Sequence, residues 1–189
     1  MDQPAYSQKA IDILDAAERH MRSGGFDAVS FRDLATEVGI KSASVHYHFP
    51  QKSDLGEAVV RRYTQHVLAA LGTPDDPSES IRSRIERLCA VYRAAVLDDG
   101  LVCLCCVLGA ESLKLPDQVA DAVNAYFTGL LDWTAKALVV ENQGDSATDR
   151  PDAAQIVASL QGAMILALAT KRPALFTGTA SRIIEQITD

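Results

Sequence analysis

Several features that would assign this 189-residue chain to a familiar class are missing from its sequence. No apolar run reaches the ~18 residues that a membrane-spanning helix requires, so we expect no membrane contact. The N-terminal stretch MDQPAYSQKA has neither a basic nor an apolar region, so we expect no secretory signal and a cytoplasmic location. In that compartment we expect reduced thiols at the few cysteines: Cys89, Cys103, Cys105 and Cys106.

The sequence motifs of common enzyme classes are missing as well. The chain contains no G-x-S-x-G, no H-E-x-x-H and no glycine-rich phosphate loop. We therefore expect no catalytic site, no cofactor and no metal ion. An excess of positive charge is also missing, because 18 Lys and Arg residues against 25 Asp and Glu give a net charge of −7. That balance argues against indiscriminate binding to nucleic acid.

The residues that are present predict helices from end to end. Ala and Leu abound, no β-strand pattern competes, and apolar residues recur at helical spacing between turn-forming segments. The sequence therefore predicts an all-α fold of about nine helices. The first three helices are expected to follow the N-caps Ser7, Ser30 and Ser42. The other six are predicted at residues 52–71, 78–98, 102–113, 117–141, 152–170 and 178–187.

The second and third of these helices are short and separated by a tight turn. In SFRDLATEVG, Ser30 with Asp33 is typical of a helix start, and Gly39 is typical of a helix end. The next helix covers residues 43–49 and ends at Pro50. Two short helices joined by a glycine-containing turn of this length indicate a helix-turn-helix, whose second helix enters the major groove of DNA.

The segment FDAVSFRDLATEVGIKSASVHYHFPQKSDLGEAVV resembles the DNA-binding region of the TetR family of bacterial transcriptional regulators. The resemblance covers roughly residues 7–63 and rests on S-F-R-D-L-A, on G-I-x-x-x-S-V and on the aromatic-H-F-x-x-K ending. It implies a helix-turn-helix domain at 1–50, a connecting helix at 52–71 and a ligand-binding and dimerisation domain at 72–189.

The resemblance also implies roles for individual residues. Arg32, Ser42, Ala43 and His46 would face bases, although the family pattern usually has Tyr where this chain has His46. The residues placed to hold phosphates would be Ser30, Ser44, Tyr47, His48 and Lys52. A metal site shared by His46 and His48 is the alternative, but two residues apart on a helix they point about 200° away from each other.

The segment that resembles the TetR family has nearly balanced charge and is not basic. Residues 1–63 contain eight Lys and Arg against nine Asp and Glu, a net charge of −1. Because non-specific affinity comes from phosphate neutralisation, we expect weak binding to non-target DNA.

Two features of the later chain suggest dimerisation and ligand binding. The 152–170 helix is rich in Ala and Gly, which lets another backbone approach closely. By resemblance, this helix and the 178–187 helix form the homodimer interface; a buried core helix is the alternative. The 117–141 helix carries Tyr126, Phe127 and Trp133, which could line a pocket for a small apolar effector or could only pack in the core.

The run VCLCC places Cys103 and Cys106 three residues apart near a predicted helix start. A helix dipole there lowers thiol pKa and favours a reactive thiolate, whereas simple packing of small apolar side chains is the alternative. VCLCCVLGAE also resembles a TetR-family subgroup in which some regulators respond to electrophiles or oxidants, with the cysteine matching Cys103.

These observations together predict a ligand-responsive repressor that binds a pseudo-palindromic DNA operator as a homodimer. A small apolar or electrophilic effector would release it from the operator. The rival interpretation is a thiol-disulfide redox protein that uses Cys103 and Cys106. It is disfavoured because the helical pattern lacks the βαβ context that accompanies such a motif.

Overall fold

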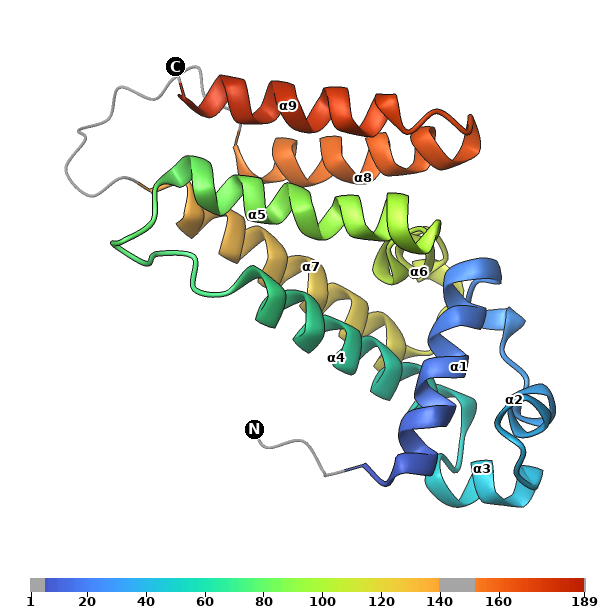
Figure 1. Ribbon diagram of the computed structural model, residues 1–189. Helices are drawn as coiled ribbons and strands as arrows, with labels where there is room; N and C mark the ends of the chain where they lie inside the picture. Colours follow the sequence, from blue (N-terminus) through green and yellow to red (C-terminus); the bar gives the residue numbers. More distant parts are fainter. Residues whose placement is uncertain (1–5, 140–151, 189) are drawn as a thin grey trace. The chain divides into compact units, whose positions relative to one another are not determined.

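The computed structural model describes residues 6–139 and 152–188, and all regular structure within these ranges is helical. The α-helices are α1 (Gln8–Gly24), α2 (Phe31–Val38), α3 (Ser42–His48), α4 (Lys52–Leu71), α5 (Ile81–Ala94), α6 (Leu104–Ala110), α7 (Asp117–Ala137), α8 (Ala153–Ala169) and α9 (Ala174–Thr188) (Figure 1). Short helical turns follow three of them: η1 (Phe26–Ala28), η2 (Ala95–Asp99) and η3 (Ser112–Lys114). The predicted all-α fold is confirmed for the described residues.

Helices α1 and α4 begin and end where the sequence predicts, because local residues define their ends. The Ser7 hydroxyl accepts a hydrogen bond from the Ala10 amide at 3.3 Å, and Gly25, with a φ of 78°, closes α1. Helix α4 follows Pro50 and stops before Gly72, whose φ is 64°.

Helices later in the chain depart from their predicted ranges. α5 starts at Ile81 instead of residue 78, because Ser80 is its N-cap. α9 starts at Ala174 instead of residue 178, since the Pro173 carbonyl already accepts the amide of Phe176 at 3.0 Å. α6 covers 104–110 of the predicted 102–113. Among the described residues, no helix has the length and apolar character needed to cross a lipid bilayer.

The segment between the predicted 117–141 and 152–170 helices lies outside the described residues. Asp152 is the N-cap of α8, and its carboxylate accepts a hydrogen bond from the Gln155 amide at 2.7 Å. The predicted end of the 117–141 helix also lies outside the described residues, in which α7 stops at Ala137.

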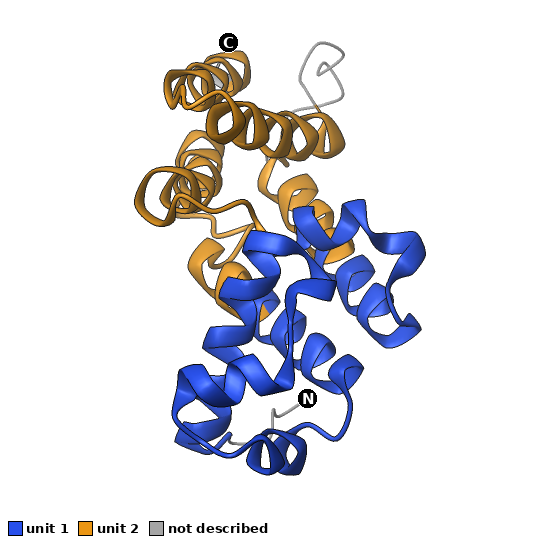
Figure 2. Cartoon of the chain, turned by 90° about the vertical axis from the view of Figure 1, so that its right-hand side faces the viewer, with its two compact units in different colours: residues 1–64, 104–126 blue, residues 65–103, 127–189 orange. Residues whose placement is uncertain are grey.

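The chain divides into two compact units (Figure 2). The first contains Met1–Thr64 and Leu104–Tyr126, and the second contains Gln65–Cys103 and Phe127–Asp189. Helices α4 and α7 each contribute one end to each unit. Each unit therefore takes residues from both sides of the predicted boundary at residue 71, and the division by function stays a prediction.

In the first unit, apolar side chains from α1, α2, α3 and the start of α4 form the core. The fully or almost fully buried side chains are Ala10, Ile13, Leu14, Met21, Leu34, Val45, Phe49 and Leu55. Removing a large apolar side chain from water contributes roughly 1.5–3 kcal/mol. The short helices α2 and α3 are held by this shared burial, because helices of eight and seven residues are marginal by themselves.

In the second unit, α8 and α9 run side by side and pack against each other (Figure 1). α8 buries Leu160 and Met164 completely, and α9 buries Phe176. Apolar side chains also remain outside this core, because Ile165 and Leu166 of α8 are 44% and 55% exposed. The helix therefore has apolar residues on more faces than its own unit covers.

Candidate nucleic-acid interface and effector site

A left-handed glycine sets the turn between α2 and α3. Gly39 has φ 71° and ψ 35°, and the Ile40 amide donates to the Ala35 carbonyl at 2.9 Å. A residue with a Cβ would lower the stability of the fold by on the order of 1 kcal/mol in this left-handed conformation, whereas glycine adopts it without that loss. At the other end of α2, the Ser30 hydroxyl accepts a hydrogen bond from the Asp33 amide at 3.4 Å, as predicted. The helix therefore has defined ends on both sides.

The start of α3 differs from the prediction by one residue. Lys41, not Ser42, is the N-cap: its backbone is extended, and its carbonyl accepts the Ser44 amide at 2.8 Å. No side chain caps the helix, and Ser42 is its first helical residue. The Ser42 hydroxyl, which was expected to cap the helix, is therefore exposed at its N-terminus.

Helix α3 separates its side chains sharply between core and surface. Val45 and Phe49 are buried at 0% and 3% exposure. Ser42, Ala43, His46 and Tyr47 are exposed and are called the reading face below. Tyr47 is 83% exposed, an unusually large exposure for an aromatic side chain. Ser44 and His48 are half-buried beside this face.

Rings on α2 and α3 fix the direction of the reading face. The His46 ring lies 4.7 Å from the Phe31 ring in an edge-on arrangement, and its Nδ1 is 3.5 Å from the Pro50 carbonyl oxygen. Tyr47 and His48 form a second edge-on pair with ring centroids 5.2 Å apart. Arg32, the second residue of α2, is exposed.

Lys52, the first residue of α4, lies against the η1 turn. Its Nζ is 4.7 Å from the centre of the Phe26 ring and 3.4 Å from the Asp27 carbonyl oxygen. The Asp27 carboxylate is 3.9 Å away. One-third of the Lys52 side chain remains exposed, so its ammonium has room for a further acceptor.

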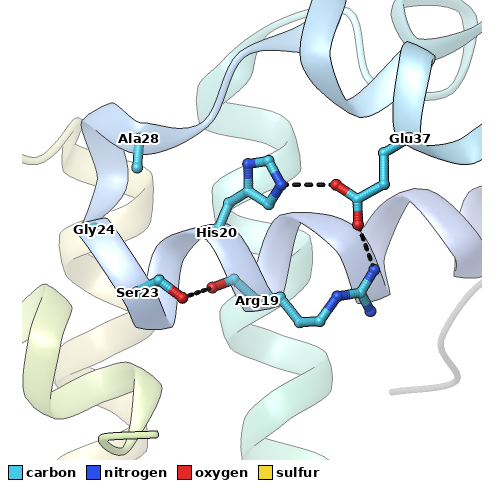
Figure 3. Close-up of a pocket in the computed structure, with 6 residues that line it drawn as sticks. All are labelled: Arg19, His20, Ser23, Gly24, Ala28 and Glu37. Carbon is cyan, nitrogen blue, oxygen red and sulfur yellow. Dashed lines mark hydrogen bonds and ion pairs between the residues drawn. The ribbon is translucent and has the colours of Figure 1, made fainter.

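A cluster of Arg19, His20 and Glu37 joins α1 to α2 (Figure 3). The carboxylate of Glu37 accepts hydrogen bonds from Arg19 Nη2 and from His20 Nε2, each at 2.7 Å. The hydrogen bond from Arg19, followed by that from His20, holds the pKa of Glu37 below its ordinary value of 4.5. We call these three residues the Glu37 cluster.

Known proteins resemble this chain in both sequence and fold. The family model for bacterial regulatory proteins of the tetR family matches residues 13–59, which run from α1 into α4. A TetR-family transcriptional regulator from Agrobacterium tumefaciens superimposes with a TM-score of 0.81 at 28% identity, covering 94% of this chain and 96% of its own. The family match and the superposition together support the TetR family for this chain.

Other relatives agree with this assignment. A TetR transcriptional regulator from Legionella pneumophila superimposes with a TM-score of 0.82 at 27% identity, over 96% of this chain and 98% of its own. The nicotine-responsive transcriptional repressor HdnoR of Paenarthrobacter nicotinovorans is 29% identical over 89 residues. That match spans 47% of this chain and 46% of the repressor, so it covers about half the length of each.

The cysteines expected to sense an effector lie at and before the start of α6. Cys103 is buried at 2% exposure just before the helix, and Cys106, inside the helix, is half-buried. All four cysteines lie among the described residues, and none of them forms a disulfide. At Cys89, burial, with a smaller effect of Glu86, raises the pKa of the thiol to about 12.

The three aromatic residues expected to line a pocket belong to different units. Tyr126 is buried in the first unit, with its ring 5.8 Å from that of Tyr63. Trp133 is buried in the second unit, where its Nε1 donates to the Gly72 carbonyl at 2.7 Å. Phe127 is half-buried. The contacts of Tyr126 and Trp133 are those of core packing, and their assignment to an effector pocket stays a prediction.

A buried polar cluster in the second unit was not foreseen from the sequence. Gln161 of α8 donates through Nε2 to the Tyr92 hydroxyl at 2.9 Å and lies 3.9 Å from the Cys103 sulfur. Its Oε1 is buried without a hydrogen-bond partner. The available clue was a single glutamine within the apolar run IVASLQGAMILALA. Buried amide oxygens are normally satisfied, so this oxygen is suited to accept a hydrogen bond from a bound molecule.

The Glu37 cluster yields a prediction on pH dependence. The pKa of Glu37 is lower in the folded chain than in the unfolded one, so its contribution to stability is present above about pH 4.5. It is lost as the pH falls through the lower folded-state pKa. Because Glu37 is 38% exposed, Glu37→Gln should lower the free energy of unfolding by only about 0.5 kcal/mol at pH 7.

Urea unfolding at pH 7 and pH 3 measures this contribution. The difference between Glu37→Gln and the unsubstituted protein should be smaller at pH 3 than at pH 7. Glu57→Gln is the matched control, because Glu57 pairs with Arg61 at 2.7 Å within one helix and joins no two helices. An equal deficit of Glu37→Gln at both pH values would contradict the assignment.

Proposed function

We propose that this chain is a ligand-responsive transcriptional repressor that binds a pseudo-palindromic DNA operator as a homodimer. The observation that carries the proposal is the reading face of α3, where Tyr47 is almost fully exposed while Val45 and Phe49 fix the helix from behind. A large exposed ring on a rigid helix is suited to contact a partner. The match to the TetR family supports operator DNA as that partner.

Residues on and beside α3 divide into two proposed groups. Ser42, Ala43 and His46, with Arg32 from α2, contact base edges in the major groove. The phosphate contacts are made by Ser30, Ser44, Tyr47, His48 and Lys52. Hydroxyl groups near a helix N-terminus favour phosphate oxygens, because the free backbone amides there point the same way. The exposure of Arg32, Ser42, Ala43, His46 and Tyr47 supports this division.

Helices α8 and α9 form the proposed homodimer interface. The exposed Ile165 and Leu166 support it, since apolar side chains of this size gain free energy when a second subunit covers them. A dimer places two copies of α3 in successive major grooves, which requires about 34–36 Å between them. A change in that spacing prevents both copies from docking and releases the operator.

The proposed effector is a small apolar or electrophilic molecule that acts on the C-terminal helices. The match to a repressor named as nicotine-responsive supports a small organic effector. Gln161, Tyr92 and Cys103 bring an unpartnered amide oxygen, a hydroxyl and a thiol together in an otherwise apolar core. Such a site suits a molecule that is mostly apolar and has one hydrogen-bond donor.

Selection of bound sequences from random DNA tests the proposal. The purified protein should enrich a sequence with two inverted half-sites, and each complex should contain two copies of the chain. Compounds can then be screened for release of the selected DNA. Enrichment of no sequence, or of a single half-site bound by one copy, would refute the proposed mode of binding.

Lys52 should contribute to affinity without contributing to sequence preference. Lys52→Ala should weaken binding to all DNA sequences alike and reduce the slope of log affinity against log salt by about one unit per half-site. Binding titrations at several salt concentrations measure both effects. An unchanged slope would mean that Lys52 contacts no phosphate.

Arg32 and His46 should determine base preference. Replacing either residue by Ala should cost on the order of 1–3 kcal/mol at particular operator positions and leave other positions unaffected. Folding should persist because both side chains are exposed. Competition binding against single-base operator variants measures the effect; a uniform loss on every variant would reassign the two residues to phosphate contacts.

Cys103 should be the thiol through which an electrophilic effector acts. Cys103 should react faster than Cys89, whose thiolate is scarce at neutral pH because its pKa is about 12. Cys103→Ser should bind the operator normally but lose release by the electrophile. Labelling rates from mass spectrometry, measured beside operator release, test this; equally slow labelling of all four cysteines would leave only a packing role.

A further inference from the structure

A carboxylate far along the chain holds the η1 turn of the first unit. Glu111, which follows α6, accepts a hydrogen bond through Oε2 from the Phe26 amide at 2.9 Å, across 85 positions of sequence. A side chain at Gly25 would displace the carboxylate, because a Cβ there would overlap Glu111 Oε1. Gly25 also has a φ of 78°. The glycine therefore provides both the turn and the space that the Glu111 carboxylate fills.

The turn that Glu111 holds is the one against which Lys52 lies. The buried Phe26 ring is 4.7 Å from Lys52 Nζ, and the Asp27 carbonyl accepts from the same ammonium at 3.4 Å. Phe26 is also confined from α4, since a Cβ added at Gly56 would lie 2.7 Å from its ring. The position of the Lys52 ammonium thus depends on Phe26 and Asp27, and the Phe26 backbone depends on Glu111.

Residues 104–126, which include Glu111, also contact the first turn of α4. Gln118 of α7 donates to Asp54 Oδ1 at 3.0 Å, and Asp54 Oδ2 accepts from the Gln51 amide at 2.9 Å. Lys52 lies between Gln51 and Asp54 in this turn. Residues 104–126 therefore restrain both the turn that carries Lys52 and the ring against which it packs.

We infer that Glu111 is a positioning residue for Lys52, an inference that rests on the proposed contact between Lys52 and operator phosphate. A lysine side chain loses rotational freedom when it binds a phosphate. Packing over an aromatic ring and a hydrogen bond to a carbonyl restrict that freedom before binding, so less is lost in the complex. By holding the Phe26 amide, Glu111 keeps the ring and the carbonyl in place.

Net charge alone and the positioning role predict opposite effects on DNA affinity when Glu111 is removed. Removing a negative charge from a DNA-binding unit should by itself strengthen binding to DNA. If Glu111 positions Lys52, Glu111→Ala should instead weaken operator affinity about fivefold and reduce the salt slope by about half a unit. Glu111→Gln keeps an acceptor oxygen for the Phe26 amide and should restore most of the affinity.

Asp121→Ala is the matched control, because Asp121 is an exposed acid of α7 in the same unit and its loss changes the charge equally. This variant should bind the operator as tightly as the unsubstituted protein or slightly more tightly. Thermal unfolding of each variant shows whether the first unit remains folded. Weakened binding by Asp121→Ala equal to that of Glu111→Ala would overturn the inference.

A double-variant cycle shows whether Glu111 acts through Lys52. In the Lys52→Ala background, Glu111→Ala should have almost no further effect on operator affinity. An undiminished fivefold loss in that background would overturn the inference, even if Glu111→Ala also lowered stability. A normal effect of Lys52→Ala with none from Glu111→Ala would overturn it while leaving the proposed function intact. Absence of operator binding by the unsubstituted protein would overturn both.

Discussion

The burial of Val45 and Phe49 is the constraint on which the reading face depends. Helix α3 has seven residues and no side-chain cap, so neither its length nor its start would keep it folded in isolation. Its two buried side chains fasten it to the core of the first unit, and the left-handed Gly39 fixes its direction relative to α2. The exposed positions of Ser42, Ala43, His46 and Tyr47 follow, because they occupy the remaining sides of a helix whose rotation is already set.

The charge distribution of the first unit explains why such rigidity is needed. Residues 1–63 have a net charge of −1, and several of their cations are already engaged: Arg19 with Glu37, Arg62 with Asp15, and Lys52 with Asp27. Arg32 and Lys41 are exposed beside the reading face. With so little positive charge, affinity cannot come from general attraction to the phosphate backbone. In the proposed homodimer, it would come from a few well-placed contacts made by both copies, an arrangement that favours specific over non-specific binding.

The sequence is most informative where a structural feature depends on neighbouring residues. Ser7, Gly25 and Gly39 define helix ends within a few positions, so α1 and α2 were predicted closely. The predicted start of α9 was wrong because that helix begins at Ala174, directly after Pro173, and Gly178 does not interrupt it. The contacts of Glu111 with Phe26 and of Gln161 with Tyr92 join residues 85 and 69 positions apart, and no local pattern encodes them. The burial of Cys103 likewise depends on tertiary packing, which its position before α6 did not reveal.

The chain itself connects the proposed sensor to the proposed DNA contacts. Cys103 directly precedes α6, and Glu111 directly follows it. A helix of seven residues is about 10 Å long, so a displacement at its first turn reaches its last turn almost undiminished, because helices transmit motion as rigid bodies. The hydrogen bond from Phe26 to Glu111 is 2.9 Å long, and lengthening it by about 1 Å would break it. A covalent change at Cys103 that shifts α6 by this amount would release the η1 turn and with it the restraint on Lys52. In the proposed mechanism, this weakening of operator binding would require no rearrangement of the helix-turn-helix core, which Val45 and Phe49 would continue to hold.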